Sequence, residues 1–172
     1  VLSDMKRNTT KEYTRNLIHT IREKVPGIAI RTTLLTGYPT ETESDFQELV
    51  DFVQEMKFNR LGVFTYSHEE NTGAYKHEDS ISEEEKMRRQ EVLMEVQSDI
   101  SYELNQALVG KTLNVLVDRK EKGIYIGRTE YDSPEVDNEV IIHSEKYLRV
   151  GDFVPVKIVA ASEFDLEART DD

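Results

Sequence analysis

Apolar residues in the first hundred positions recur at two spacings, which predict helices alternating with strands. Over residues 9–25 they recur every three or four positions, and Thr9 and Glu12 have the spacing of a capping box at a helix start. Two runs rich in apolar and β-branched residues, 28–36 and 60–67, predict strands. The order helix, strand, helix, strand predicts parallel strands joined by helical crossovers.

Two further helices complete this region. Thr42 and Asp45 form a capping pair ahead of residues 43–57, where an apolar stripe recurs at helical spacing: Phe46, Leu49, Val50, Val53 and Met56. After a polar segment, residues 68–80, a longer helix is expected over residues 82–108. Two strands with three helices cannot cover both faces of a sheet, so we expect this region to be the last part of a larger α/β domain.

Beyond residue 109 the spacing of apolar residues falls from about 3.6 to 2, which indicates strands. Five short candidates follow one another: residues 113–117, 124–129, 140–143, 154–160 and 164–168. Glycine and polar turns separate them, as is typical of small barrels. We therefore predict an α/β region over residues 1–109 and a five-stranded antiparallel, OB-like barrel over residues 110–172.

The strand of residues 28–36 runs through Gly37 and Pro39 into a capped helix, an order that α/β proteins use to build a ligand-binding rim. After the next strand, His68, Glu69 and Glu70 lie on the same side. They are candidates for acid–base chemistry, although the sequence favours a solvated loop at this position. The four histidines of the chain show no metal-ligand spacing, so we expect no metal site.

Composition narrows the classes of function. Charged residues make up 33% of the 172 positions, and the net charge is −12. The chain has no cysteine, which excludes a disulfide, a thiolate nucleophile and a cysteine-ligated metal centre within it. No apolar run reaches the length of a membrane span and no signal-peptide pattern precedes the first helix, so we expect a soluble cytoplasmic protein without membrane contact.

The segments TTLLTGYPTETESDFQELVDFV and FNRLGVFTYSHEENTGAY, with the long helix after them, resemble the last βα units of a radical S-adenosylmethionine barrel. The resemblance is closest to the methylthiotransferase family, whose C-terminal TRAM barrel is similar to residues 111–169. One branch modifies an adenosine in transfer RNA, and the other modifies an aspartate of small-subunit ribosomal protein twelve. IRTTLLTGYP and GRTEYDSPEVDNEV are more similar to the ribosomal-protein branch.

The resemblance implies that the full-length parent binds S-adenosylmethionine and two 4Fe-4S clusters held by cysteines. We expect no catalytic residue, cluster or bound cofactor in this cysteine-free chain, and no activity from it alone. The cofactor contacts implied by position are Arg31, Leu35, Gly37, Phe64 and Tyr66. The sequence is equally consistent with a structural ion pair for Arg31. It is also equally consistent with ordinary core positions for Leu35 and Phe64.

The charge of the predicted barrel indicates which class of substrate it binds. Residues 111–172 carry nine basic and fourteen acidic side chains, and five of the acids fall between residues 130 and 139. Such a barrel repels phosphate and attracts a basic protein, so we expect a basic small-subunit ribosomal protein as substrate and no direct nucleic-acid contact. The residues we assign to substrate binding are Arg128, Asp132, Ser133, Glu135 and Asp137. We expect the acids of this segment to face outward.

Four alternatives stay open. The acidic segment is equally readable as a solvated loop. The chain is also readable as a fragment of a transfer-RNA adenosine methylthiotransferase, or as a non-enzymatic acidic adaptor for a basic protein. Finally, exposed strand edges on an incomplete barrel favour pairing with a second copy, so a dimer is also open.

Overall fold

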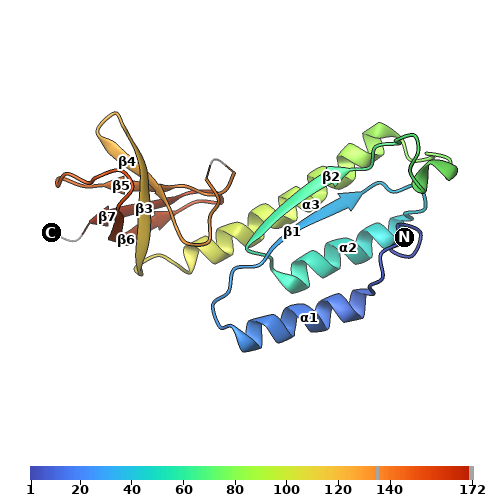
Figure 1. The fold of residues 1–172 in the computed structure, drawn as a ribbon, viewed down its shortest axis with the longest axis horizontal. Helices are drawn as coiled ribbons and strands as arrows, with labels where there is room; N and C mark the ends of the chain where they lie inside the picture. The colour runs from blue at the N-terminus through green and yellow to red at the C-terminus, as the bar shows by residue number, and fades with distance from the viewer. Residues whose placement is uncertain (135, 171–172) are drawn as a thin grey trace. The chain divides into compact units, whose positions relative to one another are not determined.

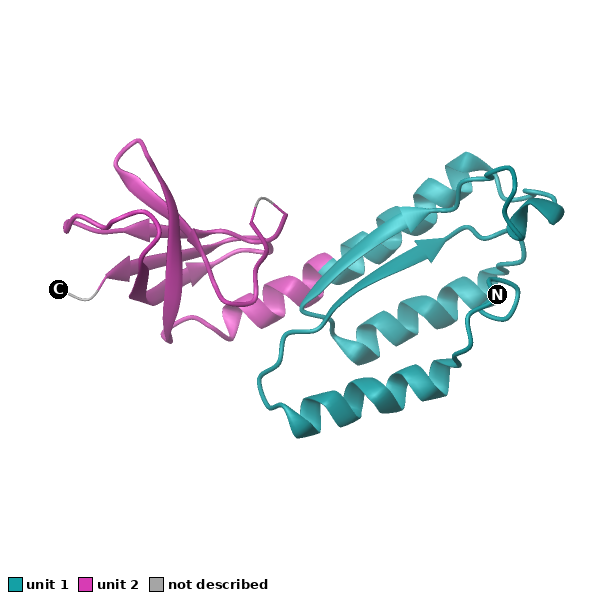
Figure 2. Cartoon of the chain, viewed as in Figure 1, with its two compact units in different colours: residues 1–97 teal, residues 98–172 magenta. Residues whose placement is uncertain are grey.

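The computed structural model describes residues 1–134 and 136–170, which form two compact units, Val1–Gln97 and Ser98–Asp172 (Figure 2). The division falls within one helix, α3 (Glu83–Gln106), so the last turns of this helix belong with the second unit. The predicted boundary at residue 109 lies just beyond the end of α3. Within the described parts of the chain, no helix has both the length and the apolarity needed to cross a membrane.

The first unit holds two parallel strands and the helices around them (Figure 1). Its elements in chain order are α1 (Lys11–Lys24), β1 (Arg31–Thr36), α2 (Glu43–Met56), β2 (Arg60–Thr65), the 3-10 helix η1 (Ala74–Lys76) and most of α3. The parallel pairing confirms the prediction, with Leu35 opposite Phe64. In the part of the chain that the structure describes, no third strand pairs with β1 or β2.

The helix starts follow the capping pattern with one correction. At α2 the Thr42 side chain accepts from the Asp45 N–H and the Asp45 side chain accepts from the Thr42 N–H, as predicted. At α1 the cap is Thr10, whose hydroxyl accepts from the Tyr13 N–H at 3.1 Å, and not Thr9. Because two threonines stand side by side there, spacing alone did not distinguish them.

Helix α1 turns much of its apolar stripe away from the sheet. Tyr13 is 62% exposed, and Leu17 and Val25 are also largely exposed. Ile18 is the residue of α1 that is buried, in a small core with Phe52 on α2. Charged pairs add to this contact between α1 and α2: Arg15 donates two hydrogen bonds of 2.7 Å to Glu55, and Lys11 donates one to Glu48.

The second unit is a closed five-stranded barrel. Its strands are β3 (Thr112–Glu121), β4 (Ile124–Arg128), β5 (Val140–His143), β6 (Phe153–Ala161) and β7 (Leu166–Thr170). Around the barrel they follow the order β3-β4-β5-β7-β6, and β6 closes the ring onto β3. This agrees with a five-stranded Greek-key barrel of the OB type.

The prediction of a wholly antiparallel barrel is wrong. β5 and β7 pair in parallel, with Ile142 opposite Ala168, while the other four neighbours are antiparallel. Directions that alternate around a closed ring require an even number of strands. A closed barrel of five strands therefore contains at least one parallel pair, and the long connection through β6 provides it here.

The barrel core is apolar and tightly closed. It is built from alternate residues of all five strands: Val115, Val117, Tyr125, Val140, Ile142, Val156, Ile158, Leu166 and Ala168, with Leu148 from a loop. Gly127 on β4 lies against β3, where an added Cβ would press on the Leu116 carbonyl oxygen and lie 2.7 Å from a methyl group of Val115. A glycine is therefore required by this close approach of two strands.

The last turns of α3 are attached to the turn between β6 and β7 by side-chain hydrogen bonds. Ser101 donates to the carbonyl of Glu163 at 2.6 Å, and Asn105 donates to the carbonyl of Ser162 at 3.0 Å. Next to Asn105, Gln106 donates to the carbonyl of Ala161 at 2.8 Å. These polar residues explain why the helix is poor in apolar residues at this end: they satisfy the carbonyl groups of the turn.

Candidate functional site

One face of the two-stranded sheet is open. Arg31 and Leu35 on β1 and Phe64 on β2 share this face, because parallel partners in register point the same way. In this chain Phe64 is 63% exposed and Leu35 is 36% exposed. The opposite face is covered by helices, against which Val63 is buried. An aromatic and an aliphatic side chain thus form a small apolar platform near the carboxyl ends of the strands.

Gly37, the residue after β1, is held in a tight turn beneath α3. Its φ of +79° is in the left-handed region that favours glycine, and an added Cβ would lie 2.5 Å from Cγ of Lys86. Its N–H donates to a carboxylate oxygen of Glu41 at 3.1 Å. Gly37 therefore contributes to the site through the shape of the turn, since its N–H is already bound.

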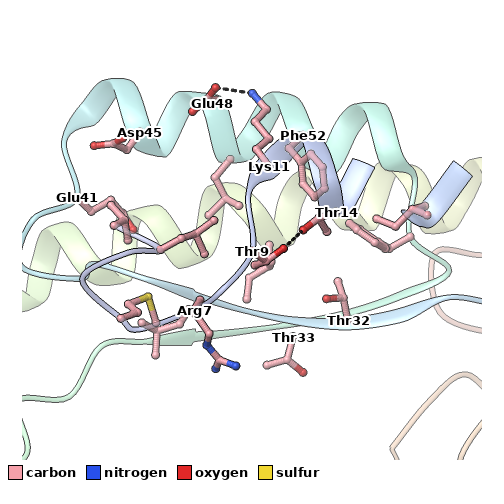
Figure 3. Close-up of a pocket in the computed structure, with 18 of the residues that line it drawn as sticks. Arg7, Thr9, Lys11, Thr14, Thr32, Thr33, Glu41, Asp45, Glu48 and Phe52 are labelled. Atoms are coloured by element: carbon pink, nitrogen blue, oxygen red, sulfur yellow. Dashed lines mark hydrogen bonds and ion pairs between the residues drawn. The ribbon is translucent and has the colours of Figure 1, made fainter. Parts of the chain in front are cut away.

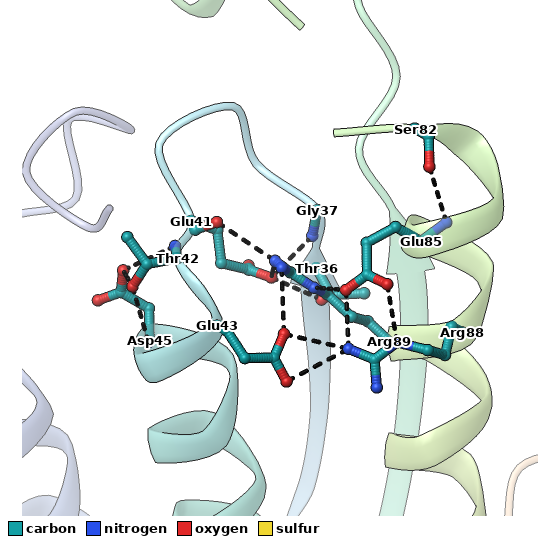
Figure 4. Close-up of polar contacts among 10 residues, drawn as sticks. All are labelled: Thr36, Gly37, Glu41, Thr42, Glu43, Asp45, Ser82, Glu85, Arg88 and Arg89. Atoms are coloured by element: carbon teal, nitrogen blue, oxygen red, sulfur yellow. Dashed lines mark hydrogen bonds and ion pairs between the residues drawn. The ribbon is translucent and has the colours of Figure 1, made fainter. Parts of the chain in front are cut away.

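Glu41 is the centre of a buried network (Figure 4). The same oxygen, Oε1, accepts from the Thr36 hydroxyl at 3.0 Å, from the Gly37 N–H, and from Nη1 of Arg89 at 2.7 Å. The side chains of Glu41 and Arg89 are 4% and 6% exposed. Three donors on one carboxylate oxygen fix the exit of β1 to α3, where Arg89 stands 48 residues beyond Glu41.

Lys86 lies one turn before Arg89 on the same helix and is fully buried. Its Nζ donates to Asp79 at 2.7 Å and to Glu83 at 2.6 Å, and it lies 5.4 Å from the centre of the Tyr66 ring. Burial lowers the pKa of Lys86, but the hydrogen bonds to the two carboxylates outweigh it, so the net direction is upward. Lys86 is therefore a buried cation that ties the loop after β2 to α3.

The contribution of Glu85 to the stability of the fold depends on pH. Hydrogen bonds from Arg88, and then from Arg89, lower its pKa from 4.5 to about 2. A lowered pKa in the folded state means that the ionised carboxylate stabilises the fold above pH 4.5, and that this stabilisation is lost as the pH falls toward 2. We expect Glu85→Gln to destabilise the protein at pH 7, with a difference from the wild type that disappears by about pH 2 in urea unfolding. A difference of constant size across this pH range would contradict this.

A cavity of about 400 Å³ opens at the carboxyl ends of β1 and β2, among Leu35, Tyr38, Thr65 and Tyr66. The Tyr38 and Tyr66 rings meet edge to face, 5.4 Å apart. The Tyr66 hydroxyl is hydrogen-bonded to Nδ1 of His68 at 3.1 Å, and burial is the main cause that raises the Tyr66 pKa. His68 in turn stacks on Tyr75, so the loop after β2 continues the aromatic wall.

Tyr38 carries a buried hydroxyl that has no hydrogen-bond partner among the described residues. An unsatisfied buried hydroxyl costs about 1–3 kcal/mol, so we expect Tyr38→Phe to leave the free energy of unfolding unchanged or to raise it by about 1 kcal/mol. Tyr66→Phe is the matched control. It removes the hydrogen bond to His68 and should lower stability by about 1 kcal/mol. Equal losses in thermal unfolding of the two variants would show that the Tyr38 hydroxyl is hydrogen-bonded after all.

A second, larger cavity of about 640 Å³ lies beside β1, between α1 and α2 (Figure 3). Thr32 and Thr33 of β1 border it, as does Phe52 of α2. The Lys11–Glu48 ion pair, 2.6 Å long, connects the two helices over it. The cavity therefore follows the edge of β1 that has no paired strand among the described residues.

The acidic segment of the barrel differs from the expectation. Glu130 is exposed, but Asp132 is 9% exposed and accepts a hydrogen bond from the Thr129 hydroxyl at 2.5 Å, so the prediction that it faces outward is wrong. Asp137 is half-buried and accepts from the Ser133 N–H at 2.7 Å. These two aspartates shape the loop, and Glu135 lies outside the described residues.

Arg128 and Glu139, at the two ends of this segment, are both paired. Arg128 lies 3.1 Å from Asp118, and Arg119 donates to both carboxylate oxygens of Glu139 at 2.7 and 3.0 Å. Arg128 is the last residue of β4, and Asp132, Ser133 and Asp137 lie in the loop that follows it. Within the described ranges, no group of three or more His, Cys, Asp or Glu side chains is arranged to hold a metal ion.

Sequence reasoning missed the residues that hold the rim. It assigned no role to Glu41, Lys86 or Arg89, all of which the structure buries. Only a weak local pattern in the sequence marks these residues. Arg89 and Lys86 contact Glu41 and Gly37, which precede them by more than forty residues. The spacing of three between Lys86 and Arg89, on the face of α3 toward the sheet, is the one feature that pointed to them.

Both units of the chain are similar in sequence to known proteins. A family model for the TRAM domain matches residues 109–170. The chain is 55% identical over 167 residues to the ribosomal protein uS12 methylthiotransferase RimO of Flavobacterium psychrophilum, and 56% identical to that of Cytophaga hutchinsonii. Each alignment covers 96% of this chain but only 39% and 38% of the relative. The chain therefore spans about two fifths of the length of these curated relatives.

Proposed function

We propose that this chain belongs to the RimO methylthiotransferase family and is the C-terminal part of an enzyme that places a methylthio group on the β-carbon of an aspartate in ribosomal protein uS12. The observation that carries the proposal is the identity of about 55% that extends through both units. The alternative of a non-enzymatic adaptor has no such support. We place the enzyme in the cytoplasm, with the ribosomal protein as its partner.

We propose that the first unit completes a radical S-adenosylmethionine barrel. Three features support this: the open face with Leu35 and Phe64, the unpaired edge of β1 within the described residues, and the exposed apolar residues of α1 such as Tyr13. Each is what a sheet shows when further strands and helices belong beside it. Pairing of the same edges between two copies is the competing explanation, and it predicts a dimer of the isolated chain.

The residues on the open face fit the adenosyl part of the cofactor. Leu35 and Phe64 offer apolar surface, and the 400 Å³ cavity beside them adds the Tyr38 and Tyr66 rings. Arg31, exposed on the same face, suits a carboxylate. Bound to a reduced 4Fe-4S cluster, S-adenosylmethionine is the family's source of the radical that removes hydrogen from the substrate. The cysteines for both clusters must come from outside this chain, which has none.

Reductive cleavage of S-adenosylmethionine tests this assignment. The full-length protein, reconstituted with iron and sulfide, should release 5′-deoxyadenosine, and this chain alone should release none. We expect calorimetry to detect only weak cofactor binding to the chain alone, with a Kd above about 1 mM, because most of the barrel contacts are missing. A full-length protein that neither cleaves nor binds the cofactor would contradict the proposal.

We propose that the TRAM barrel captures the basic substrate through charge. Residues 111–172 carry five more acidic than basic side chains, which disfavours transfer RNA. Because Asp132 and Asp137 shape the loop, we assign the contact with the substrate to its exposed residues Glu130 and Ser133 and to the half-buried Arg128 that precedes them. The role of Asp132 and Asp137 is then to hold Ser133 and Glu130 in place.

We expect Glu130→Lys in the full-length enzyme to slow association with uS12 about two- to fivefold at low salt, because a rim charge acts mainly by steering. Glu163→Lys is the matched control, since Glu163 is also exposed but lies on the β6–β7 turn. Stopped-flow association rates at two salt concentrations measure the effect. Equal association rates for the two variants would show that this loop does not contact uS12. Tight binding of transfer RNA would overturn the proposal that uS12 is the substrate.

A further inference from the structure

Two loops meet at the carboxyl ends of β1 and β2, and both are attached to the first turns of α3. The loop after β1 begins with Gly37, and the loop after β2 includes Asp79. Lys86 and Arg89 lie three residues apart on α3, which places them on one face of the helix. One helix therefore reaches both loops through two adjacent buried cations.

Arg89 fixes the first loop by several bonds. Its guanidinium donates to the Glu41 carboxylate at 2.7 Å and to the Glu41 carbonyl at 3.3 Å, while Nε donates to Glu85 at 2.8 Å. It also lies 5.3 Å from the centre of the Phe46 ring. The planar fork of arginine reaches all these groups at once, which a lysine at this position cannot do.

Lys86 fixes both loops with one side chain. Its aliphatic stem packs under Gly37, so closely that an added Cβ there would lie 2.5 Å from Cγ. Its Nζ holds Asp79 of the other loop at 2.7 Å. Displacing Lys86 thus moves the floor of the first loop and the anchor of the second together.

Stability alone does not explain buried ions at this place. A buried ion pair contributes little to stability compared with apolar residues of similar volume, because desolvation offsets the attraction. What such a pair adds is a defined geometry, since each bond has a fixed length and direction. The geometry here is that of the turn between Leu35 and Tyr38, which borders the proposed cofactor site.

We infer that Lys86 and Arg89 are positioning residues, which hold the loops after β1 and β2 in the arrangement that binds S-adenosylmethionine. This rests on the proposed function, because it concerns the same site. Neither residue has to touch the cofactor, since Arg89 acts through Glu41 and Lys86 acts through Gly37 and Asp79. The inference predicts a loss of affinity that does not depend on a loss of stability.

The test uses the full-length protein with the double substitution Glu41→Gln and Arg89→Met. Removing both charges leaves no lone buried ion, so the variant should fold, and glutamine keeps an oxygen that can accept from Thr36 and Gly37. We expect its thermal midpoint without cofactor to stay near that of the wild type. Its affinity for S-adenosylmethionine, measured by calorimetry well below that midpoint, should fall about ten- to a hundredfold, as expected for a misplaced site.

Two companion variants sharpen the result. Arg88→Met is the matched control, because Arg88 is the neighbouring residue, pairs with Glu43 and Glu85, and is exposed. Its cofactor affinity should equal that of the wild type. Lys86→Met keeps an apolar stem under Gly37 but releases Asp79, so its affinity should fall less than that of the double variant.

The outcomes separate this inference from the proposed function. If the wild type binds S-adenosylmethionine and the double variant binds it equally well, the inference is overturned and the proposed function stands. A lower thermal midpoint with unchanged affinity also overturns the inference, because the network is then purely structural. If the wild type does not bind the cofactor at all, the proposed function fails and the inference fails with it.

Discussion

Replacing Gly127 with alanine will destabilise the TRAM barrel by about 3 kcal/mol or more, the largest effect we expect from a single methyl group in this chain. The new Cβ meets the Leu116 carbonyl oxygen of the neighbouring strand and lies 2.7 Å from Val115. The first contact is with backbone, so no side-chain rotation relieves it. β3 must move away from β4, and the hydrogen bonds beside Leu116 and Arg128 are strained with it.

Hydrogen exchange can locate the destabilisation within the barrel, because it reports the opening of individual strands. We expect faster exchange at the amides of β3, β4 and β6 in Gly127→Ala, with β1 and β2 unchanged. Gly62→Ala is the matched control, since Gly62 is also in a strand but the atom nearest to its Cβ position, Oγ1 of Thr33, is 4.0 Å away. That variant should differ from the wild type by less than about 0.5 kcal/mol. Equal effects of the two alanines would contradict the close approach.

Removing Arg89 will cost far more stability than removing Lys86, although both are buried cations on the same face of α3. Arg89→Met leaves Glu41 behind as an unpaired carboxylate that is 4% exposed, which costs about 3–5 kcal/mol. Lys86→Met leaves Glu83, 77% exposed, and Asp79, 21% exposed, so both partners keep more contact with water than Glu41 does. We expect about 1 kcal/mol for that change, the range of a partly exposed ion pair.

Urea unfolding of the two single variants at pH 7 measures the difference. A larger loss for Lys86→Met than for Arg89→Met would show that the burial of the cation, and not of the partner left behind, sets the cost.

Much of the fold could be predicted because its signals are local. The period of the apolar residues identified the helices and strands of both units, and the capping pair of Thr42 and Asp45 placed the start of α2. The parallel pair β1 and β2 followed from the order of elements. Family resemblance then identified the TRAM barrel, which the match over residues 109–170 confirms.

What could not be predicted depends on contacts between distant parts of the chain. The period of α1 predicted a helix but not that Tyr13 and Leu17 would be exposed, because which side of a helix is covered depends on what lies beside it. Glu41 and Arg89 are separated by 48 residues, and no pattern links them. Asp132 was expected to face outward because a short polar segment with Pro134 makes a poor buried strand, yet Asp132 is buried and accepts a hydrogen bond from the Thr129 hydroxyl.

The measurement that tests the central claim most directly is mass spectrometry of uS12 after incubation with the full-length enzyme, S-adenosylmethionine, a sulfur source and a reductant. We expect one aspartate of uS12 to gain a methylthio group in place of a hydrogen atom, and transfer RNA in the same reaction to stay unmodified. A methylthio group on transfer-RNA adenosine with none on uS12 would assign the chain to the other branch. Modification of neither, by an enzyme that cleaves the cofactor, would contradict the proposed substrate.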